Sequence, residues 1–116
     1  MAGIKNFKVD ASTNFRFTII YRDPDGDPID LTQYSVRMDI KSAPGSKKIL
    51  ASAIAGDGIT ITPLIGKIEV NINKEKTSQI AYPKSAYDLV ITHLPTQTVT
   101  RLVEGWLEVS RAVTVI

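Results

Sequence analysis

The densest group of chemically capable side chains in this sequence is a run of carboxylates at residues 23–30. Asp23, Asp25 and Asp27 alternate with proline and glycine, and Asp30 follows shortly after. Alternate acidic residues begin the calcium loop of EF-hand proteins, where carboxylate oxygens bind a hard cation. The match then fails, because the glycine and the bidentate glutamate that the loop requires are replaced by proline and tyrosine. We therefore expect an acidic β-turn, no metal site and no cofactor, with calcium at the four aspartates as the alternative.

Catalytic chemistry has few candidates. His93 is the single histidine of the chain. A hydrolytic histidine needs a nucleophile in a recognisable turn and a carboxylate that orients the ring, and no such residues stand at a telling spacing from it. Asp88 and Glu104 could form an acid–base pair across a hairpin, but pairing of these exposed charges with Arg101 is the simpler interpretation. The sequence therefore predicts a protein without catalytic residues that is not an enzyme.

Composition narrows the class of protein further. The chain has 116 residues, a formal net charge of +2 and no cysteine. This length suits one domain, and the small net charge gives no reason to expect nucleic acid or an anionic membrane as a partner. The absence of cysteine excludes disulfides and cysteine-based zinc sites, and no apolar run is long enough for a signal peptide or a membrane span. We expect one soluble domain over residues 1–116, synthesised in a cytoplasm.

The candidate side chains must be positioned by strands, because apolar and polar residues alternate with period two along most of the chain. In residues 13–22, Phe15, Phe17 and Ile19 share one parity. Similar runs cover residues 34–41, 48–52, 59–62, 67–73, 86–92 and 98–110, with turn-forming residues between them. Residues 59–62 and 67–73 are expected to form a hairpin. Asn73 can cap a short helical turn over residues 74–80.

The two longest runs form a second hairpin within residues 85–114. In its last strand, Val99 and Val103 have one parity, whereas Leu102 and Trp106 have the other. Strict alternation would therefore expose a large apolar side chain. A β-bulge shifts the side-chain phase by one residue, and glycine is tolerated at such positions. We predict a bulge at Gly105 that buries both valines and Trp106.

These strands predict the fold class. Short strands with turn signals every 8–12 residues or so and almost no helix are typical of a sandwich of two sheets. We expect an all-β, antiparallel immunoglobulin-like β-sandwich of seven to eight strands, with one short helical turn near residues 74–80. A small barrel is the alternative, because periodicity determines the faces of strands and does not determine closure.

A set of turn and core motifs runs through nearly the whole chain. The motifs are FKVD at residues 7–10, NFRFT at 14–18, YRDPDG at 21–26, PIDLT at 28–32, VRM at 36–38, AYDL at 86–89, TRL at 100–102, the glycine at 105 and VT at 113–114. This succession resembles small virion proteins of tailed bacteriophages that have an immunoglobulin-like sandwich. The N-terminal domain of baseplate upper proteins and tail-fibre adaptors belong to this group.

The resemblance implies a function rather than a set of site residues. A member of this group would be a non-enzymatic structural protein of the virion, in the tail or baseplate, that links or anchors fibres by contacts with other virion proteins. It would act in several symmetric copies, without nucleic acid or membrane as partners. The interaction candidates are Phe7, Trp106, Val113 and Ile116, although Phe7 and the last residues could instead complete the sandwich.

Two alternatives stay open. A head decoration or collar protein would differ only in its partner. A carbohydrate-binding module contacting host glycans would need coplanar exposed aromatic rings, for which Trp106, Tyr34 and Tyr82 are the available set. Burial of these rings in a core or at a protein contact is the simpler interpretation, because Trp and Tyr carry much of the energy of buried contacts.

Overall fold

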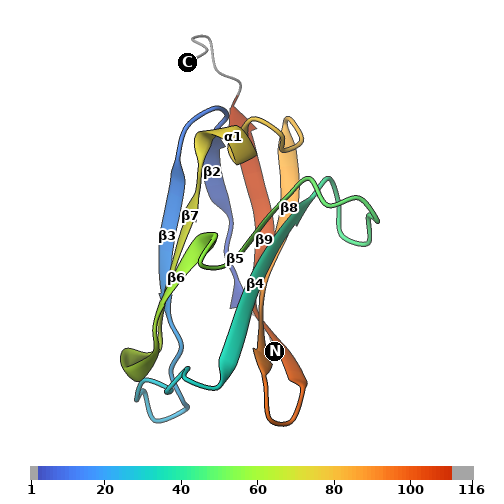
Figure 1. Cartoon of the computed structure of the whole chain (residues 1–116). Coiled ribbons are helices and arrows are strands. Elements are labelled where there is room, and N and C mark those ends of the chain that lie inside the picture. Colours follow the sequence, from blue (N-terminus) through green and yellow to red (C-terminus); the bar gives the residue numbers. More distant parts are fainter. Residues whose placement is uncertain (1–2, 111–116) are drawn as a thin grey trace.

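The chain forms two layers of strands joined into one curled sheet (Figure 1). The computed structural model describes residues 3–110. Its strands are β1 (Gly3–Ile4), β2 (Phe7–Asp10), β3 (Phe15–Ile20), β4 (Tyr34–Lys41), β5 (Ala51–Ala55), β6 (Gly58–Thr62), β7 (Lys67–Ile72), β8 (Lys84–His93) and β9 (Thr98–Ser110). A 3-10 turn, η1 (Pro63–Ile65), and a single helical turn, α1 (Lys74–Thr77), complete the elements of this region. The all-β prediction is confirmed.

The order of strands is β1-β9-β8-β4-β5-β6-β7-β3, and β2 also pairs with β9. In Figure 1, β9, β8 and β4 lie on one side of the molecule, and β3, β7 and β6 lie on the other. The predicted hairpins are present, because β6 pairs with β7 and β8 with β9 in antiparallel register. Asn73 caps α1 as expected, since its side chain accepts from the Lys76 N–H at 2.9 Å.

The sheet is mixed, whereas we expected purely antiparallel pairing. β1 and β2 run parallel to β9, and β5 runs parallel to β6. The second case comes from a tight loop between β5 and β6, where Gly58 has a φ of 94° that favours glycine. Only two residue pairs, Ile54–Gly58 and Ala55–Ile59, join the layers there. The chain therefore folds over at this loop, and the two layers become a continuous curl.

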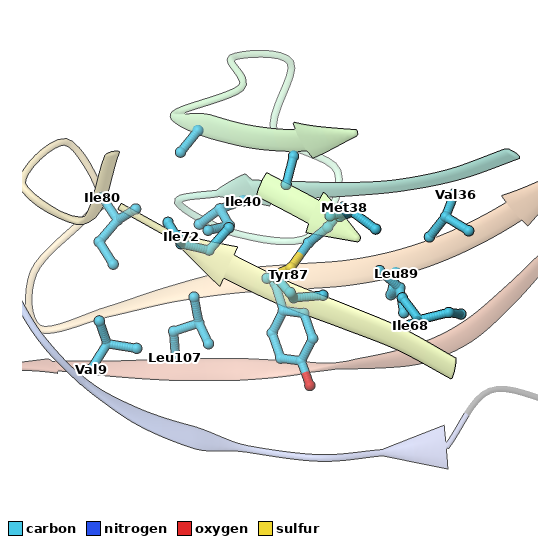
Figure 2. Packing of buried hydrophobic residues seen from close by; sticks show 14 of the residues in the cluster. Val9, Val36, Met38, Ile40, Ile68, Ile72, Ile80, Tyr87, Leu89 and Leu107 are labelled. Carbon is cyan, nitrogen blue, oxygen red and sulfur yellow. The ribbon is translucent and has the colours of Figure 1, made fainter. Parts of the chain in front are cut away.

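The core lies between the layers. Figure 2 shows Met38, Ile40, Leu89 and Leu107 from one layer directed toward the space that Ile68 also enters from the other. All five side chains are at most 1% exposed. Full burial of an aliphatic side chain of this size contributes about 1.5–3 kcal/mol. The period-two apolar parity of each strand therefore identifies the face that packs inward.

The predicted β-bulge exists, but its position was wrong. Strands β8 and β9 pair through Gly105, and the register shifts where Leu89 faces Val103 while Val90 faces Arg101. Leu102 is therefore the extra residue, three positions before the predicted one. The shift lets Leu102 and Val103 both pack against the core. Two large side chains that we expected to be buried are not: Val99 is 63% exposed, and Trp106 lies half-buried outside the core.

Two of the predicted interaction residues, Val113 and Ile116, lie outside the described residues. Phe7 packs inward instead of presenting itself to solvent. Its ring stacks on Phe17 at 4.8 Å between centroids and meets Phe15 edge-on at 5.3 Å. These contacts join β2 to β3, so Phe7 closes one side of the fold near the end where both strands meet.

Candidate functional site

The outward surface of β4, β8 and β9 carries three cross-strand rows of side chains, and we call it the outer face. Residues paired in register share one face of a sheet. The middle row is Asp39, Asp88 and Glu104. The row on one side is Lys41, Ala86 and Trp106, and the row on the other is Arg37, Val90 and Arg101. Three carboxylates therefore stand side by side across three strands.

Like charges directly opposite each other destabilise a sheet, so this row needs compensation. Arg101 supplies part of it, because its guanidinium lies 3.2 Å from the Asp88 carboxylate and 2.8 Å from that of Glu104. Arg37 pairs with Asp39 at 2.9 Å. The predicted pairing of Asp88 and Glu104 with Arg101 is thus present, and the arrangement contains both signs of charge within one surface.

A groove with a volume of about 690 Å³ runs over this surface. Its walls include Trp106, Lys41 and the carboxylate row, and the β4–β5 loop at residues 43–45 overhangs one side. Lys84 places its ammonium 4.3 Å from the centre of the Trp106 ring, a cation–π geometry that holds the indole on the sheet. The groove therefore combines an aromatic ring with charges of both signs.

The N-terminal strand forms another wall of the groove and is fastened at the break between β1 and β2. The side-chain oxygen of Asn6 accepts a hydrogen bond from the backbone N–H of Trp106 at 2.9 Å. The Lys5 carbonyl accepts from the Tyr87 hydroxyl at 2.6 Å. A Cβ on Gly105 would stand 2.2 Å from that same carbonyl oxygen. Gly105 is thus required for this close approach of two backbones, whereas the sequence prediction gave it a different role, a β-bulge that shifts the side-chain phase.

The acidic turn at residues 23–30 is organised by its own backbone. The Asp23 carboxylate accepts hydrogen bonds from the N–H groups of Asp25 and Asp27, both at 3.0 Å. Asp30 turns to Thr32 instead, whose hydroxyl and backbone N–H both donate to it and lower the pKa of Asp30 below its ordinary value. Within residues 3–110, no group of three or more potential ligands is arranged to hold a metal ion. The geometry is that of an Asx-type turn.

His93 lies at the far end of β8 from the groove. Its Nδ1 is 2.8 Å from the Thr96 hydroxyl, and its ring is 5.0 Å from that of Tyr34. Five residues along the strand separate His93 from Asp88, a span of about 17 Å. The structure therefore does not bring His93 together with the carboxylate row.

The three aromatic residues considered for sugar stacking do not form one platform. Tyr34 starts β4 opposite His93, whereas Trp106 lies in the row of Lys41 at the other end of that strand. Tyr82 precedes β8 and is 53% exposed. Trp106 is thus the one of the three rings that lines the groove.

Sequence reasoning found Asp88, Arg101, Glu104 and Trp106 but missed Asn6, which lines the groove, and Lys84, which lies over the Trp106 ring. Asn6 lies between β1 and β2, which run parallel beside β9, and Lys84 acts through a ring contact, so both contacts connect distant parts of the chain. The sequence carried two signals for the contact between the N-terminal strand and β9. One was the short polar break near residue 6, and the other was Gly105 within the last strand. Neither identifies a partner until the strand order is known.

Comparison with known proteins supports the fold class and assigns no family. No family model and no curated protein matches the sequence. Among solved structures, the chain is similar to the NK cell receptor Nkp44, described as a triggering partner in natural cytotoxicity. The TM-score is 0.53, with 13% identity over 95% of this chain and 99% of that one. This likeness fits an immunoglobulin-like fold.

The described residues contain no helix of the length and apolar character that crossing a bilayer requires.

Proposed function

We propose that this chain is a non-enzymatic structural protein of a bacteriophage particle, built on an immunoglobulin-like sandwich. It acts in the tail or baseplate region and links or anchors fibres by protein–protein contacts. The observation that carries the proposal is the outer face, where Trp106 and three adjacent carboxylates occupy one groove. The phage assignment itself depends on the motif resemblance.

The composition of the outer face suits recognition of a protein surface. Trp and Arg are enriched among residues that dominate interface energetics, and both are present here as Trp106 and Arg101. Their positions are fixed before any partner binds, because Lys84 covers the indole and two carboxylates hold the guanidinium. Preorganised side chains lose less conformational freedom on binding, which favours affinity.

The carboxylate row gives the groove a directional charge pattern. Asp39, Asp88 and Glu104 form an acidic line, with Arg37 and Arg101 on one side of it and Lys41 on the other. A partner with complementary charges would bind in one register, since a shifted register places like charges together. Specific orientation is what a fibre-anchoring protein requires. Weak contacts of this kind multiply when several copies bind together.

Cross-linking mass spectrometry of purified particles from the source phage tests the proposal. A lysine-reactive reagent should join Lys41 and Lys84, beside the groove, to a tail or baseplate protein. Lys67, on β7 in the opposite layer, is the internal control and should give few such links. Absence of the chain from intact particles, or cross-links to the partner centred on Lys67, would refute the proposal.

A further inference from the structure

β3 has one unpaired edge. All six of its residues pair with β7, and its other side pairs with no strand of the part of the chain that the structure describes. One residue past β3, the Tyr21 N–H donates to the Gly66 carbonyl at 2.8 Å, in the direction of β7. Backbone groups alternate in direction along an antiparallel ladder, so those of Arg16, Thr18 and Ile20 point away from β7. These three residues offer their N–H and C=O groups to another strand.

The free edge of β3 lacks the usual protection against strand addition. Edge strands in proteins are commonly short, interrupted or charged. At the other end of the strand order, β1 and β2 fit that description, because the chain breaks between them at Lys5 and Asn6. β3 is continuous over six residues, has Arg16 as its one charged side chain and presents Ile20 at 40% exposure. This edge is therefore suited to pairing.

The same edge is accessible from solvent. Figure 1 shows β3 at the margin of its layer. Beside its last residues, a crevice of about 430 Å³ lies between residues 19–22 and residues 100–103 of β9. The side chains of Arg16, Thr18 and Ile20 are exposed on the outward side of β3. A strand can therefore approach the outward backbone groups.

We infer that the free edge of β3 pairs with the same edge of a second copy of this chain, antiparallel and about a two-fold axis at Thr18. In this register Thr18 faces Thr18 of the second copy, and Arg16 of each copy faces Ile20 of the other. All three outward residues of each strand then form hydrogen-bonded pairs, in which the two residues exchange both N–H···O=C bonds. The contact is isologous, because the same residues serve both copies, and it closes as a dimer.

Hydrogen bonds and charge both favour this register. A shift by two residues leaves an outward residue of each β3 without a β3 partner, and in one direction it brings the two copies of Arg16 closer together. Like charges opposite each other destabilise a sheet. In the proposed register the two arginines lie about 14 Å apart, beyond a Debye length of about 8 Å. Each Arg16 can instead cover the exposed Ile20 of the other copy with its methylene groups.

The inward face of β3 is complementary to itself as well. Phe17 and Ile19 lie on this face and are partly buried against the core. In the proposed register, Phe17 of each copy faces Ile19 of the other, and aromatic with β-branched residues is a favourable cross-strand pair. Pairing would remove apolar surface of these side chains from water. An identical strand therefore matches the edge in backbone, charge and apolar surface, which identifies a second copy as the occupant.

The inference goes beyond the proposed function, because β3 belongs to the layer opposite the outer face (Figure 1). A dimer formed through β3 leaves both outer faces open to other partners. The tests use the isolated full chain, so failure of the particle cross-linking would reject the virion role without changing their result.

The two-fold axis makes position 18 a specific probe. The chain has no cysteine, so Thr18→Cys gives it a single thiol. Residues of a hydrogen-bonded antiparallel pair have Cα atoms about 5.5 Å apart, within the range that a disulfide spans. Thr60→Cys is the matched control, because Thr60 on β6 is exposed and lies in the same cross-strand row as Thr18, two strands inward. Under mild oxidation, Thr18→Cys should form a disulfide-linked dimer, and Thr60→Cys should stay monomeric at the same concentration.

Charged variants test the same pairing without a covalent bond. Sedimentation velocity of wild type should show a reversible dimer with a Kd of about 1 mM or tighter. Thr18→Lys and Thr18→Glu each place like charges opposite each other at the axis, so each alone should dimerise about fivefold more weakly. Their equimolar mixture should form a dimer at least as tight as wild type, because opposite charges then face each other.

A second position keeps the test decisive if Thr18→Glu, which lies beside Glu69, does not fold by circular dichroism. Ile20→Glu faces Arg16 of the second copy and should tighten the dimer, whereas Ile20→Lys should weaken it. Wild type that is monomeric at all concentrations, or equal disulfide dimer from Thr18→Cys and Thr60→Cys, would overturn the inference. A mixture of the charged variants no tighter than either alone, or equal dimerisation of the two Ile20 variants, would also overturn it.

Discussion

Replacing Gly105 with alanine should detach the N-terminal strand from β9. The new Cβ would lie 2.2 Å from the Lys5 carbonyl oxygen and 2.8 Å from the Asn6 side-chain oxygen. Real Cβ atoms do not approach backbone this closely, so the segment at Lys5 and Asn6 has to move. Gly3→Ala is the matched control on the same strand pair, because its Cβ would meet its nearest neighbour, the Leu102 carbonyl, at 3.7 Å.

The expected loss follows from three hydrogen bonds that hold this segment. The Tyr87 hydroxyl donates to the Lys5 carbonyl at 2.6 Å. The backbone N–H of Trp106 donates to the Asn6 side-chain oxygen at 2.9 Å, and the Lys5 N–H donates to the Glu104 carbonyl at 3.0 Å. Each contributes about 1 kcal/mol net, so their loss should lower the free energy of unfolding by about 3 kcal/mol. For a domain of 116 residues, that corresponds to a decrease in Tm of about 12 °C.

Differential scanning calorimetry measures both variants, and amide hydrogen exchange locates the change. Gly105→Ala should accelerate exchange at Lys5 and Trp106, whereas Gly3→Ala should stay within about 0.5 kcal/mol of wild type. The combination with Tyr87→Phe should be less than additive, because both changes disturb the same carbonyl. A Tm for Gly105→Ala equal to that of Gly3→Ala would show that the N-terminal strand is not fastened as described.

Three further predictions concern single side chains. Burial raises the pKa of Tyr87 from 10.0 to about 12, so on a rise in pH the unfolded chain loses this proton before the folded chain does. The associated stabilisation is fully present below pH 10 and should fall as the pH rises toward 12. Thermal melts should therefore show a steeper decrease of Tm with pH for wild type than for Tyr87→Phe. Asp88→Asn removes a carboxylate flanked by two others but also removes a partner of Arg101. Its free energy of unfolding in urea titrations should therefore differ from that of wild type by less than about 1 kcal/mol, while cross-linking of Lys84 to the partner declines. A large destabilisation would mean that the carboxylate row is structural. Asp23→Ala loses the acceptor of two hydrogen bonds in the acidic turn and should lower the free energy of unfolding by about 1 kcal/mol in the same assay. Neither calcium nor EDTA should change the Tm of wild type. A calcium-dependent rise in Tm would favour a cation site at the aspartates.

Much of the fold was predictable because burial follows strand parity. Phe15 and Phe17, Val36 and Met38, and Leu89 and Ile91 lie on the inward faces that alternation indicated. The position of the bulge was predicted wrongly, because a phase change at Gly105 keeps Val99 and Val103 on one face, whereas the observed change at Leu102 separates them and leaves Val99 63% exposed. The strand order explains the difference, because Gly105 lies against the backbone between β1 and β2, which pair in parallel with β9, and it stays in the β8–β9 ladder.

The outer face was partly predictable. The hairpin predicted that Asp88, Glu104 and Arg101 lie close together. Alternation alone assigns Glu104 and Arg101 to opposite faces, and the bulge at Leu102 brings them onto one surface. Sequence could not show that β4 lies next to β8 in a register that adds Asp39 to the row. It also could not show that Asn6 reaches Trp106, since 100 residues separate them in the chain.

The most direct test of the central claim is an electron cryo-microscopy reconstruction of the source phage particle. The account predicts density for this domain in repeated copies in the tail or baseplate, with the groove around Trp106 and the carboxylate row covered by another virion protein. Density for the domain with its outer face open to solvent, or its absence from the particle, would contradict the account.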